Sequence, residues 1–249
     1  MPGSSGPDTA DRLALAALVR ALPVGAVEDV LRDCGLAARR VRALPPWVTT
    51  YHVLASAMRP ALTYGDVTDL LWTTLPAATG RGLAHPKPTS GAVTRARSRL
   101  GAEPLAVLAR RAARAALGDS AAEAVELHRY GPEGLSGCWW ITDRETGLLR
   151  GCDVRGDELG AAADLVRASG AVHVVVSAAD VDTAALDRAV GATIVTVEPG
   201  PGGPASGGAL WSRVRARTPE AWRQDVLART CVELAAEVAL RDTGPILRP

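Results

Sequence analysis

The sequence predicts an α+β chain in two parts, an all-α helical domain at residues 1–118 followed by a reduced α/β domain with a short mixed sheet at residues 119–249. In the first part, apolar residues recur at helical spacing between prolines and glycines. The second part contains short apolar runs that are typical of strands. The charges also divide, because residues 1–118 hold 15 basic and 8 acidic side chains, whereas residues 119–249 hold 13 and 19.

Composition places the chain among globular proteins. Its 249 residues are 47% hydrophobic and 22% charged, which excludes a wholly disordered chain. No apolar run is long enough to cross a membrane, and the first ten residues lack the pattern of a signal peptide, so we expect a cytoplasmic protein with no membrane partner. The four cysteines form no C-x-x-C pair, which predicts reduced thiols and not a zinc or disulfide scaffold.

The first part is expected to be a series of short helices. Asp8 or Thr9 can cap the first helix, Gly35 can end the second, and Thr63 with Asp66 has the form of a capping box. Prolines separate several of the segments and are expected to stop helices. The expected helices cover about residues 9–22, 24–34, 36–44, 46–58 and 64–75, before a loop at residues 76–88.

Residues 81–114 form the most basic stretch, with eight basic residues against one acid. A helix is expected at residues 90–100, ended by Gly101, and a second begins at Glu103, so the pattern is helix, tight turn, helix. On the first of these helices Arg95 and Arg99 share one flank and Arg97 projects from the other. The inward face is expected to consist of Val93, Ala96 and Leu100.

A basic surface of this kind favours a polyanionic partner, and we expect DNA. A solvated helix face, or docking against the acidic half of the chain, would produce the same charge pattern. The candidate DNA-binding residues are Lys87, Arg95, Arg97, Arg99, Arg110, Arg111 and Arg114.

The second part predicts a β-hairpin and then a βαβ unit. The hairpin consists of strands at residues 138–142 and 148–154 around a polar turn that ends in Gly147. Parallel strands are expected where helices separate the apolar runs. The glycine-rich stretch at residues 200–208 lacks the spacing of a phosphate-binding loop and is interpreted as a linker. The remaining elements are a helix at 157–169, a strand at 172–177, a helix from about 182, a strand at 193–197 and a helix at 218–240.

Other residues with chemical potential have ordinary structural explanations. Turns and helix N-termini account for the acids at positions 143, 145, 153, 157 and 158, so we expect no metal site and no cofactor. Trp139 and Trp140 point to opposite faces of one strand and are expected to pack. An alternative is a new small-molecule pocket in the second part, and its candidate lining residues are Trp139, Trp140, His128 and His173, with Cys138.

Residues 62–71 and 89–105, with the helix after Pro46, resemble the N-terminal domain of insertion-sequence transposases of the IS-four group. The resemblance spans about residues 13–117, and its most specific part is the run A-R-x-R-L-G-x-E-P-L at residues 96–105. It implies DNA as a partner and, through the family, a possible homodimer. A fainter similarity continues into the family's RNase H-like catalytic domain, where two Asp and one Glu hold two divalent metals.

The catalytic carboxylates implied by the resemblance do not appear at the matching positions. The hairpin around Asp143 resembles the second and third strands of the family fold, and residues 123–137 are too short an interval for the first strand and its Asp. Ala178 stands at the second Asp position, with Asp180 two residues late, and the glycine-rich linker replaces the segment that bears the Glu. We therefore expect a transposase-derived DNA-binding protein that is not competent for strand transfer. A scaffold repurposed for a small molecule, or a decaying gene product, stays open.

Overall fold

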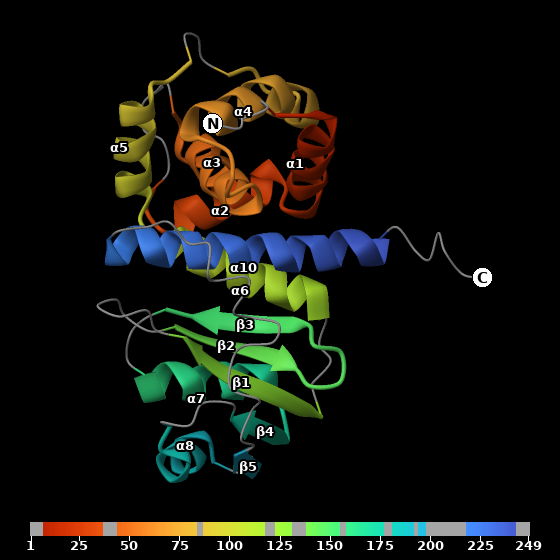
Figure 1. Cartoon of the computed structure of the whole chain (residues 1–249), viewed down its shortest axis with the longest axis vertical. Helices are drawn as coiled ribbons and strands as arrows, with labels where there is room; N and C mark the ends of the chain where they lie inside the picture. The colour runs from red at the N-terminus through yellow and green to blue at the C-terminus, as the bar shows by residue number, and fades with distance from the viewer. Residues whose placement is uncertain are drawn as a thin grey trace, which may run out of the picture. The chain divides into compact units, whose positions relative to one another are not determined.

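The computed structural model describes residues 7–36, 44–83, 87–117, 123–130, 138–154, 158–176, 181–191, 194–197 and 218–242. The chain forms two compact units. Figure 1 shows that one unit consists of helices and that the other contains a sheet with helices. The first unit comprises residues 1–108 together with residues 231–249, and the second comprises residues 109–230. This division differs from the boundary expected at residue 118, because the C-terminal end of the chain belongs with the helical unit.

The helical unit is built around α3, in which every side chain from Val48 to Ala55 is buried. Helices α2, α4 and α5 all pack against α3, and α1 packs against α4. The helix α6 begins in this unit and α10 ends in it. The bounds are α1 Thr9–Ala21, α2 Val24–Asp33, α3 Pro46–Met58, α4 Tyr64–Thr79, α5 Ser90–Leu100, α6 Glu103–Leu117 and α10 Pro219–Asp242.

The helix starts follow the capping chemistry of the sequence. Asp8 and Asp11 form a capping box at α1, and Thr63 and Asp66 form one at α4, so each side chain accepts a hydrogen bond from a backbone N–H that the first turn leaves unsatisfied. Asp11 is also ion-paired with Arg59, which follows the last residue of α3 as its C-cap. The predicted capping residues of α1 and α4 are therefore confirmed.

The end of α4 differs from the prediction. The helix passes through Pro76, which was expected to begin a loop, and ends at Gly80 in the left-handed conformation with φ +67°. The Gly80 N–H donates to the carbonyl of Pro76, and the Thr79 hydroxyl donates to the carbonyl of Leu75. Proline has no N–H and therefore removes one helical hydrogen bond. The hydrogen bonds of Gly80 and Thr79 in the last turn offset this loss. The helix expected at residues 36–44 lies mostly outside the described residues.

The second unit contains a five-stranded mixed sheet in the order β3-β2-β1-β4-β5. The strands β1, β2 and β3 form an antiparallel meander, and β4 and β5 continue the sheet parallel to β1. The hairpin of β2 and β3 and the βαβ unit of β4, α8 and β5 confirm the sequence prediction. The bounds are β1 Ala124–Tyr130, β2 Cys138–Asp143, β3 Leu149–Asp153, α7 Glu158–Ser169, β4 His173–Val176, α8 Thr183–Val190 and β5 Ile194–Val197.

The strand β1 corrects the expectation that residues 123–137 are too short to hold a first strand. It lies in the middle of the sheet, with Leu127 paired to Ile141 of β2 on one side and to Val176 of β4 on the other. Alternate residues of β1, Val125 and Leu127, enter the core of the unit beneath α7 and α8. The segment is short, but it buries both of these side chains completely.

Apolar side chains of the sheet and of α7 form the core of the second unit, with Trp139 and Ile141 from β2 and Ala161 to Ala163 from α7. Small alanines let α7 lie close against the strands, and Gly151 of β3 approaches Leu165 in the same place.

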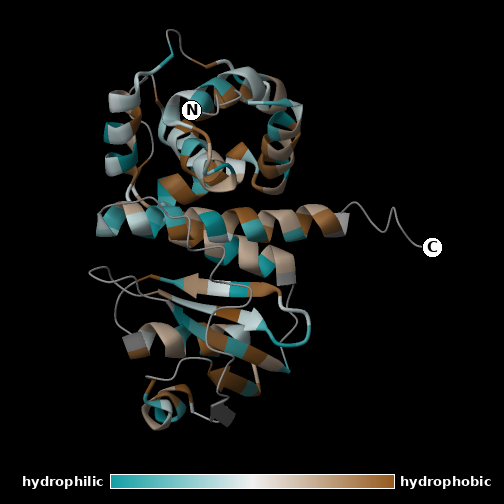
Figure 2. Cartoon of the chain, in the orientation of Figure 1, coloured by the Kyte–Doolittle hydropathy of each residue, from teal (hydrophilic) through white to brown (hydrophobic). Residues whose placement is uncertain are grey.

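In Figure 2, α5 of the helical unit is mainly white and teal, in keeping with its polar composition. Across the described residues, none of the helices combines the length and the apolar character needed to span a bilayer.

Candidate nucleic-acid interface

The helix α5 presents a polar face to solvent. Thr89 caps it by accepting a hydrogen bond from the N–H of Ala92, and Gly101 follows its last residue. The buried side consists of Val93, Ala96, Arg97 and Leu100, which pack toward α3 and α4. We call the remaining exposed set the α5 outer face, and it consists of Ser90, Gly91, Thr94, Arg95, Ser98 and Arg99.

Two cations of the α5 outer face have no partner among the residues that the structure describes. Arg95 and Arg99 are exposed and lie one helical turn apart, and no described side chain forms an ion pair with either guanidinium group. Lys87, which precedes the helix, is different, because its Nζ lies 2.7 Å from Oδ1 of Asp69 on α4. The net positive charge of this surface therefore comes mainly from the two arginines.

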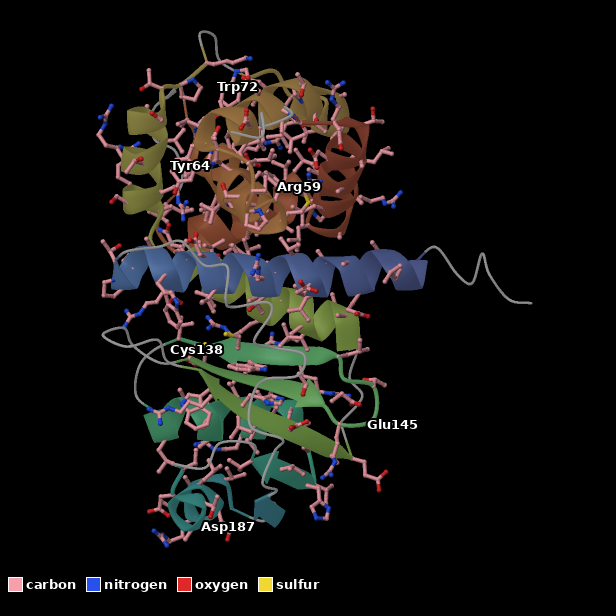
Figure 3. All side chains as sticks on the ribbon, viewed as in Figure 1. Arg59, Tyr64, Trp72, Cys138, Glu145 and Asp187 are labelled. Atoms are coloured by element: carbon pink, nitrogen blue, oxygen red, sulfur yellow. The ribbon has the colours of Figure 1, made fainter. Side chains whose placement is uncertain are left out.

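Arg97 corrects the sequence prediction. It was expected to project from the flank opposite Arg95, but only 5% of Arg97 is exposed. Its guanidinium donates a hydrogen bond to the hydroxyl of Tyr64 and lies over the Tyr64 ring, 5.4 Å from the centroid. Figure 3 labels Tyr64, at the start of α4 on the side where α5 lies. Arg97 therefore joins α5 to α4 and is not available on the surface.

The sequence contained a signal for this position. Arg97 follows Val93 by four residues and precedes Leu100 by three, so it shares the inward face of the helix with both. A charged residue in an apolar register indicates a buried partner, and a sequence cannot show which distant residue supplies it. The partner, Tyr64, lies thirty-three positions earlier in the chain.

Behind Tyr64 lies a buried histidine that the sequence analysis did not single out as functional. The His52 ring meets the Tyr64 ring edge to face, with the centroids 5.5 Å apart. Its Nε2 lies 3.4 Å from both the Tyr64 carbonyl and the Thr68 hydroxyl. Burial is the main cause that lowers the pKa of His52 to about 4, and the charge of Arg97 lowers it further. His52 is therefore neutral at pH 7, and its contacts with Tyr64 and Thr68 join α3 to α4.

The three remaining candidate arginines lie on α6. Arg110, Arg111 and Arg114 are exposed, whereas the alanines between them, such as Ala112 and Ala113, are buried. These three arginines belong to the second compact unit, and Lys87, Arg95, Arg97 and Arg99 belong to the first. The seven predicted DNA-binding residues therefore divide between two units, and the α5 outer face is the part that one unit provides by itself.

The four residues of the predicted pocket are not gathered in one place. His128 and Trp140 face each other across β1 and β2, with their rings stacked 5.1 Å apart, and His128 also lies 3.1 Å from the Thr142 hydroxyl. Trp139 points to the other face, into the core beneath α7. His173 is exposed at the start of β4, where it pairs with Ala124 at the opposite end of β1 from His128. Burial is the main cause that lowers the pKa of His128.

The acidic turn of the β2–β3 hairpin also has a structural explanation. The Oδ1 atom of Asp143 accepts hydrogen bonds from the N–H groups of Glu145 and Thr146 and from the Thr146 hydroxyl. Its Oδ2 atom accepts two more from Nε and Nη2 of Arg150, at 3.1 and 2.7 Å. Burial raises the pKa of Asp143, but these hydrogen bonds and the Arg150 charge lower it by more, so the pKa is below its usual value. The Glu145 label in Figure 3 marks this turn.

A metal centre would need several ligands in one place. Among the described residues, no three side chains of the His, Cys, Asp and Glu types are grouped so that they could hold a metal ion. The positions that the sequence analysis compared with metal-binding acids, Ala178 and Asp180, lie outside the described residues, as does the glycine-rich stretch at 200–208.

Part of the chain matches a known protein family. Residues 12–110 match the family described as "Insertion element 4 transposase N-terminal". The matched segment runs from α1 into α6 and contains the whole of α5 and its outer face. No curated protein and no solved structure matches the chain.

Proposed function

Because residues 12–110 match the N-terminal family of insertion element 4 transposases, we propose that this chain is a transposase-derived protein that binds duplex DNA through its helical unit and does not carry out strand transfer. The observation that carries the proposal is the α5 outer face, where Arg95 and Arg99 are exposed and unpaired among the described residues. The helix contains no acidic residue, so its solvent side offers only positive charge and hydroxyl groups to a polyanion. A role on DNA agrees with the cytoplasmic location that the sequence predicts.

Among the described residues of the helical unit, the pairing and spacing of the cations support the choice of α5. Arg32, Arg59, Arg81 and Lys87 are all ion-paired with acids of the same unit. The partners of Arg59 and Arg81 come from other helices, so these two cations join helices together. A guanidinium that is already paired must give up its partner before it can bind a phosphate. Among the described residues, Arg95 and Arg99 have no such partner to lose. Arg12 and Arg20 of α1 have none among them either, but they lie eight positions apart on a helix that begins with the acids Asp8 and Asp11.

The absence of strand transfer is proposed on chemical grounds. Two-metal transfer of a DNA strand needs carboxylates that converge on two ions about 4 Å apart. Asp143 is a poor candidate ligand, since both of its oxygens already accept hydrogen bonds from the hairpin and from Arg150. The sheet order β3-β2-β1-β4-β5 supports descent of the second unit from an RNase H-like domain, because the hairpin lies on one side of β1 and the parallel strands on the other.

A salt titration tests the DNA proposal. The full chain is titrated against labelled duplex DNA in a mobility-shift assay at several salt concentrations, and we expect the affinity to fall steeply as salt rises. The double variant Arg95→Gln and Arg99→Gln should reduce the slope of log affinity against log salt by about 2. The matched control is the double variant Arg12→Gln and Arg20→Gln, which removes the same charge from exposed positions of α1 and should leave the slope nearly unchanged.

Two results would contradict this proposal. If the wild-type chain retards no duplex even at low salt, it is not a DNA-binding protein. If it nicks supercoiled plasmid with Mg²⁺ or Mn²⁺, and the activity disappears on substitution of Asp143 or Asp180, the chain has kept metal-dependent cleavage. The nicking assay uses the full chain at nanomolar concentration, with a metal-free reaction as the control.

The pocket alternative is not proposed, because the structure separates His173 and Trp139 from the stacked pair of His128 and Trp140. Self-association stays a prediction of the family resemblance.

A further inference from the structure

The α5 outer face combines two features that a simple charged surface does not need. Its two arginines lie on one line along the helix, at positions 95 and 99, and the other exposed side chains beside them are all small. Long side chains would hold the helix away from a ligand, whereas Gly91, Thr94 and Ser98 allow close approach. A Cβ added at Gly91 would meet only the Nη1 atom of Arg95, at 3.6 Å. The surface therefore fits a ligand that the helix itself can approach.

The major groove of DNA has the right dimensions for such a helix. It is about 12 Å wide, and an α-helix with its side chains is about 10–12 Å in diameter. An arginine on the groove side can form two hydrogen bonds with the O6 and N7 atoms of guanine, the commonest specific contact of a helix in this groove. Ser and Thr hydroxyls beside it can donate to phosphate oxygens or to base edges. The composition of the outer face matches these needs.

The opposite side of α5 holds the helix in one orientation. Val93, Ala96 and Leu100 are buried, and Arg97 is hydrogen-bonded to Tyr64 and stacked on its ring. A helix that is fixed in this way cannot rotate about its axis, so the Cα–Cβ bonds of Arg95 and Arg99 keep a constant direction. Such preorganisation reduces the loss of conformational entropy on binding and makes the spacing of the two arginines meaningful.

That spacing can be compared with the spacing of bases. Residues one turn apart in an α-helix rise by about 6 Å, and successive bases of one DNA strand are about 3.4 Å apart. Two arginines at positions 95 and 99 would therefore meet bases about two steps apart, when the helix lies along the groove. Arg12 and Arg20 of α1 have no such arrangement, because they lie eight positions apart with the exposed, apolar Leu13 between them.

We infer that Arg95 and Arg99 determine the sequence specificity of this protein, each by binding the major-groove edge of a guanine, with the two guanines about two base steps apart in duplex DNA. The inference rests on the proposed DNA-binding function and adds to it that the α5 outer face reads bases. A duplex that lacks one of the two guanines should bind about tenfold more weakly, since a bidentate arginine contact discriminates by about that factor or more.

Selection from a pool of random duplexes tests the inference. The full chain is used to enrich bound duplexes over several rounds, and we expect two guanines at a constant short spacing in the enriched pool. The variants Arg95→Lys and Arg99→Lys keep the charge but lose the two-pronged geometry of the guanidinium. Each should still bind DNA with a nearly unchanged salt slope. Each should show weaker enrichment at one guanine, because an ammonium group can donate to O6 and N7 but lacks the planar pair of donors of a guanidinium. Arg12→Lys is the matched control and should enrich the same sequence as the wild type.

A chemical substitution in the DNA distinguishes groove reading from phosphate binding. Replacement of each selected guanine by 7-deazaguanine removes the N7 acceptor and leaves the phosphates unchanged. The wild-type affinity should fall about tenfold, and the affinity of the matching single variant, Arg95→Gln or Arg99→Gln, should change little. Enrichment without guanines, or enrichment that both lysine variants retain undiminished, would overturn the inference while DNA binding stands. Failure of the wild type to retain any duplex would instead overturn the proposed function.

Discussion

Arg97 and Arg99 lie two positions apart on α5 and have different surroundings. Arg99 is exposed, whereas Arg97 is enclosed between α5 and α4, where the Tyr64 hydroxyl accepts its hydrogen bond. The aliphatic part of an arginine can pack in an apolar contact while its planar head lies on an aromatic ring. The same residue type therefore serves packing at one position and is offered to a ligand at the other.

This difference predicts that substitution destabilises the chain much more at position 97 than at position 99. Arg97→Met keeps the apolar stem but loses the hydrogen bond and the contact with the Tyr64 ring, so it should lower the free energy of unfolding by roughly 1–3 kcal/mol. Arg99→Met should change that free energy by less than about 0.5 kcal/mol, because the side chain is exposed. Urea unfolding of the full chain, followed by tryptophan fluorescence, measures both. Equal stability of the two variants would show that the Arg97 contact contributes nothing.

His52 should make the stability of the helical unit depend on pH. The pKa of His52 is about 4 in the folded chain, mainly because of burial, and about 6.5 in an unfolded chain. The unfolded chain therefore binds the proton first as pH falls. The stabilisation is complete above pH 6.5 and is lost progressively down to about pH 4, by roughly 3 kcal/mol in all.

The variant His52→Gln separates this effect from that of the carboxylates. Gln can form hydrogen bonds with the Thr68 hydroxyl and the Tyr64 carbonyl, but it does not titrate. Thermal unfolding measured between pH 7 and pH 4 should show a shallower loss of stability in the variant than in the wild type. Parallel curves for the two proteins would mean that His52 does not couple stability to pH.

At the scale of elements, one carboxylate joins the turn of the β2–β3 hairpin to Arg150 of β3. Asp143 accepts hydrogen bonds from the turn and from Arg150, so Asp143→Asn should destabilise the second unit by about 1–3 kcal/mol. Because the pKa of Asp143 is lowered, its contribution is present above about pH 3.9 and is lost as pH falls below that value. Chemical unfolding at pH 7 and pH 3 measures both effects.

The neighbouring Glu145 provides the control for this prediction. Its side chain is exposed at the same turn, so Glu145→Gln removes an acid from the hairpin without removing these contacts. The control variant should unfold like the wild type at both pH values. If both variants unfold alike, the hydrogen bonds of Asp143 do not stabilise the hairpin.

Local sequence patterns predicted the elements whose causes are local. The N-terminal cap of α1, the capping box of α4, the start of α3 at Pro46 and the turn of the β2–β3 hairpin depend on residues a few positions apart, and all were predicted from the sequence. The second half of the α1 capping box, Asp11, was not predicted. The strand β1 was missed because its stability comes from β2 and β4, which pair with it from distant parts of the chain. The burial of Arg97 was missed for the same reason, since its partner Tyr64 lies on another helix.

At the scale of the whole molecule, the two compact units do not correspond to two continuous halves of the sequence. A boundary at residue 118 follows the change from helical to strand patterns, but the last part of α10 belongs to the helical unit. Within that unit Cys231 donates a hydrogen bond to the Leu105 carbonyl, and Leu234 and Ala235 are buried. The family match at residues 12–110 therefore covers only the part of this unit that is continuous in sequence.

This arrangement predicts that the N-terminal half is incomplete by itself. A fragment of residues 1–118 lacks the part of α10 that the helical unit buries, so apolar surface around Leu105 loses its cover. The fragment should unfold at a lower temperature than the helical unit of the full chain. In the full chain, Leu234→Ala should have the same direction of effect and cost about 2–5 kcal/mol, as is usual for a completely buried leucine.

Circular dichroism at the helical band measures both unfolding transitions, and Leu240→Ala is the matched control. Leu240 lies on the same helix but is 69% exposed, so its truncation should leave the transition nearly unchanged. A fragment as stable as the full chain, together with no effect of Leu234→Ala, would place the C-terminal helix outside the cooperative unit. The transposase-like segment would then fold without the rest of the chain, and its DNA affinity should be retained in the fragment. Loss of DNA affinity on truncation, with recovery when α10 is restored, is the outcome that the two-segment unit predicts.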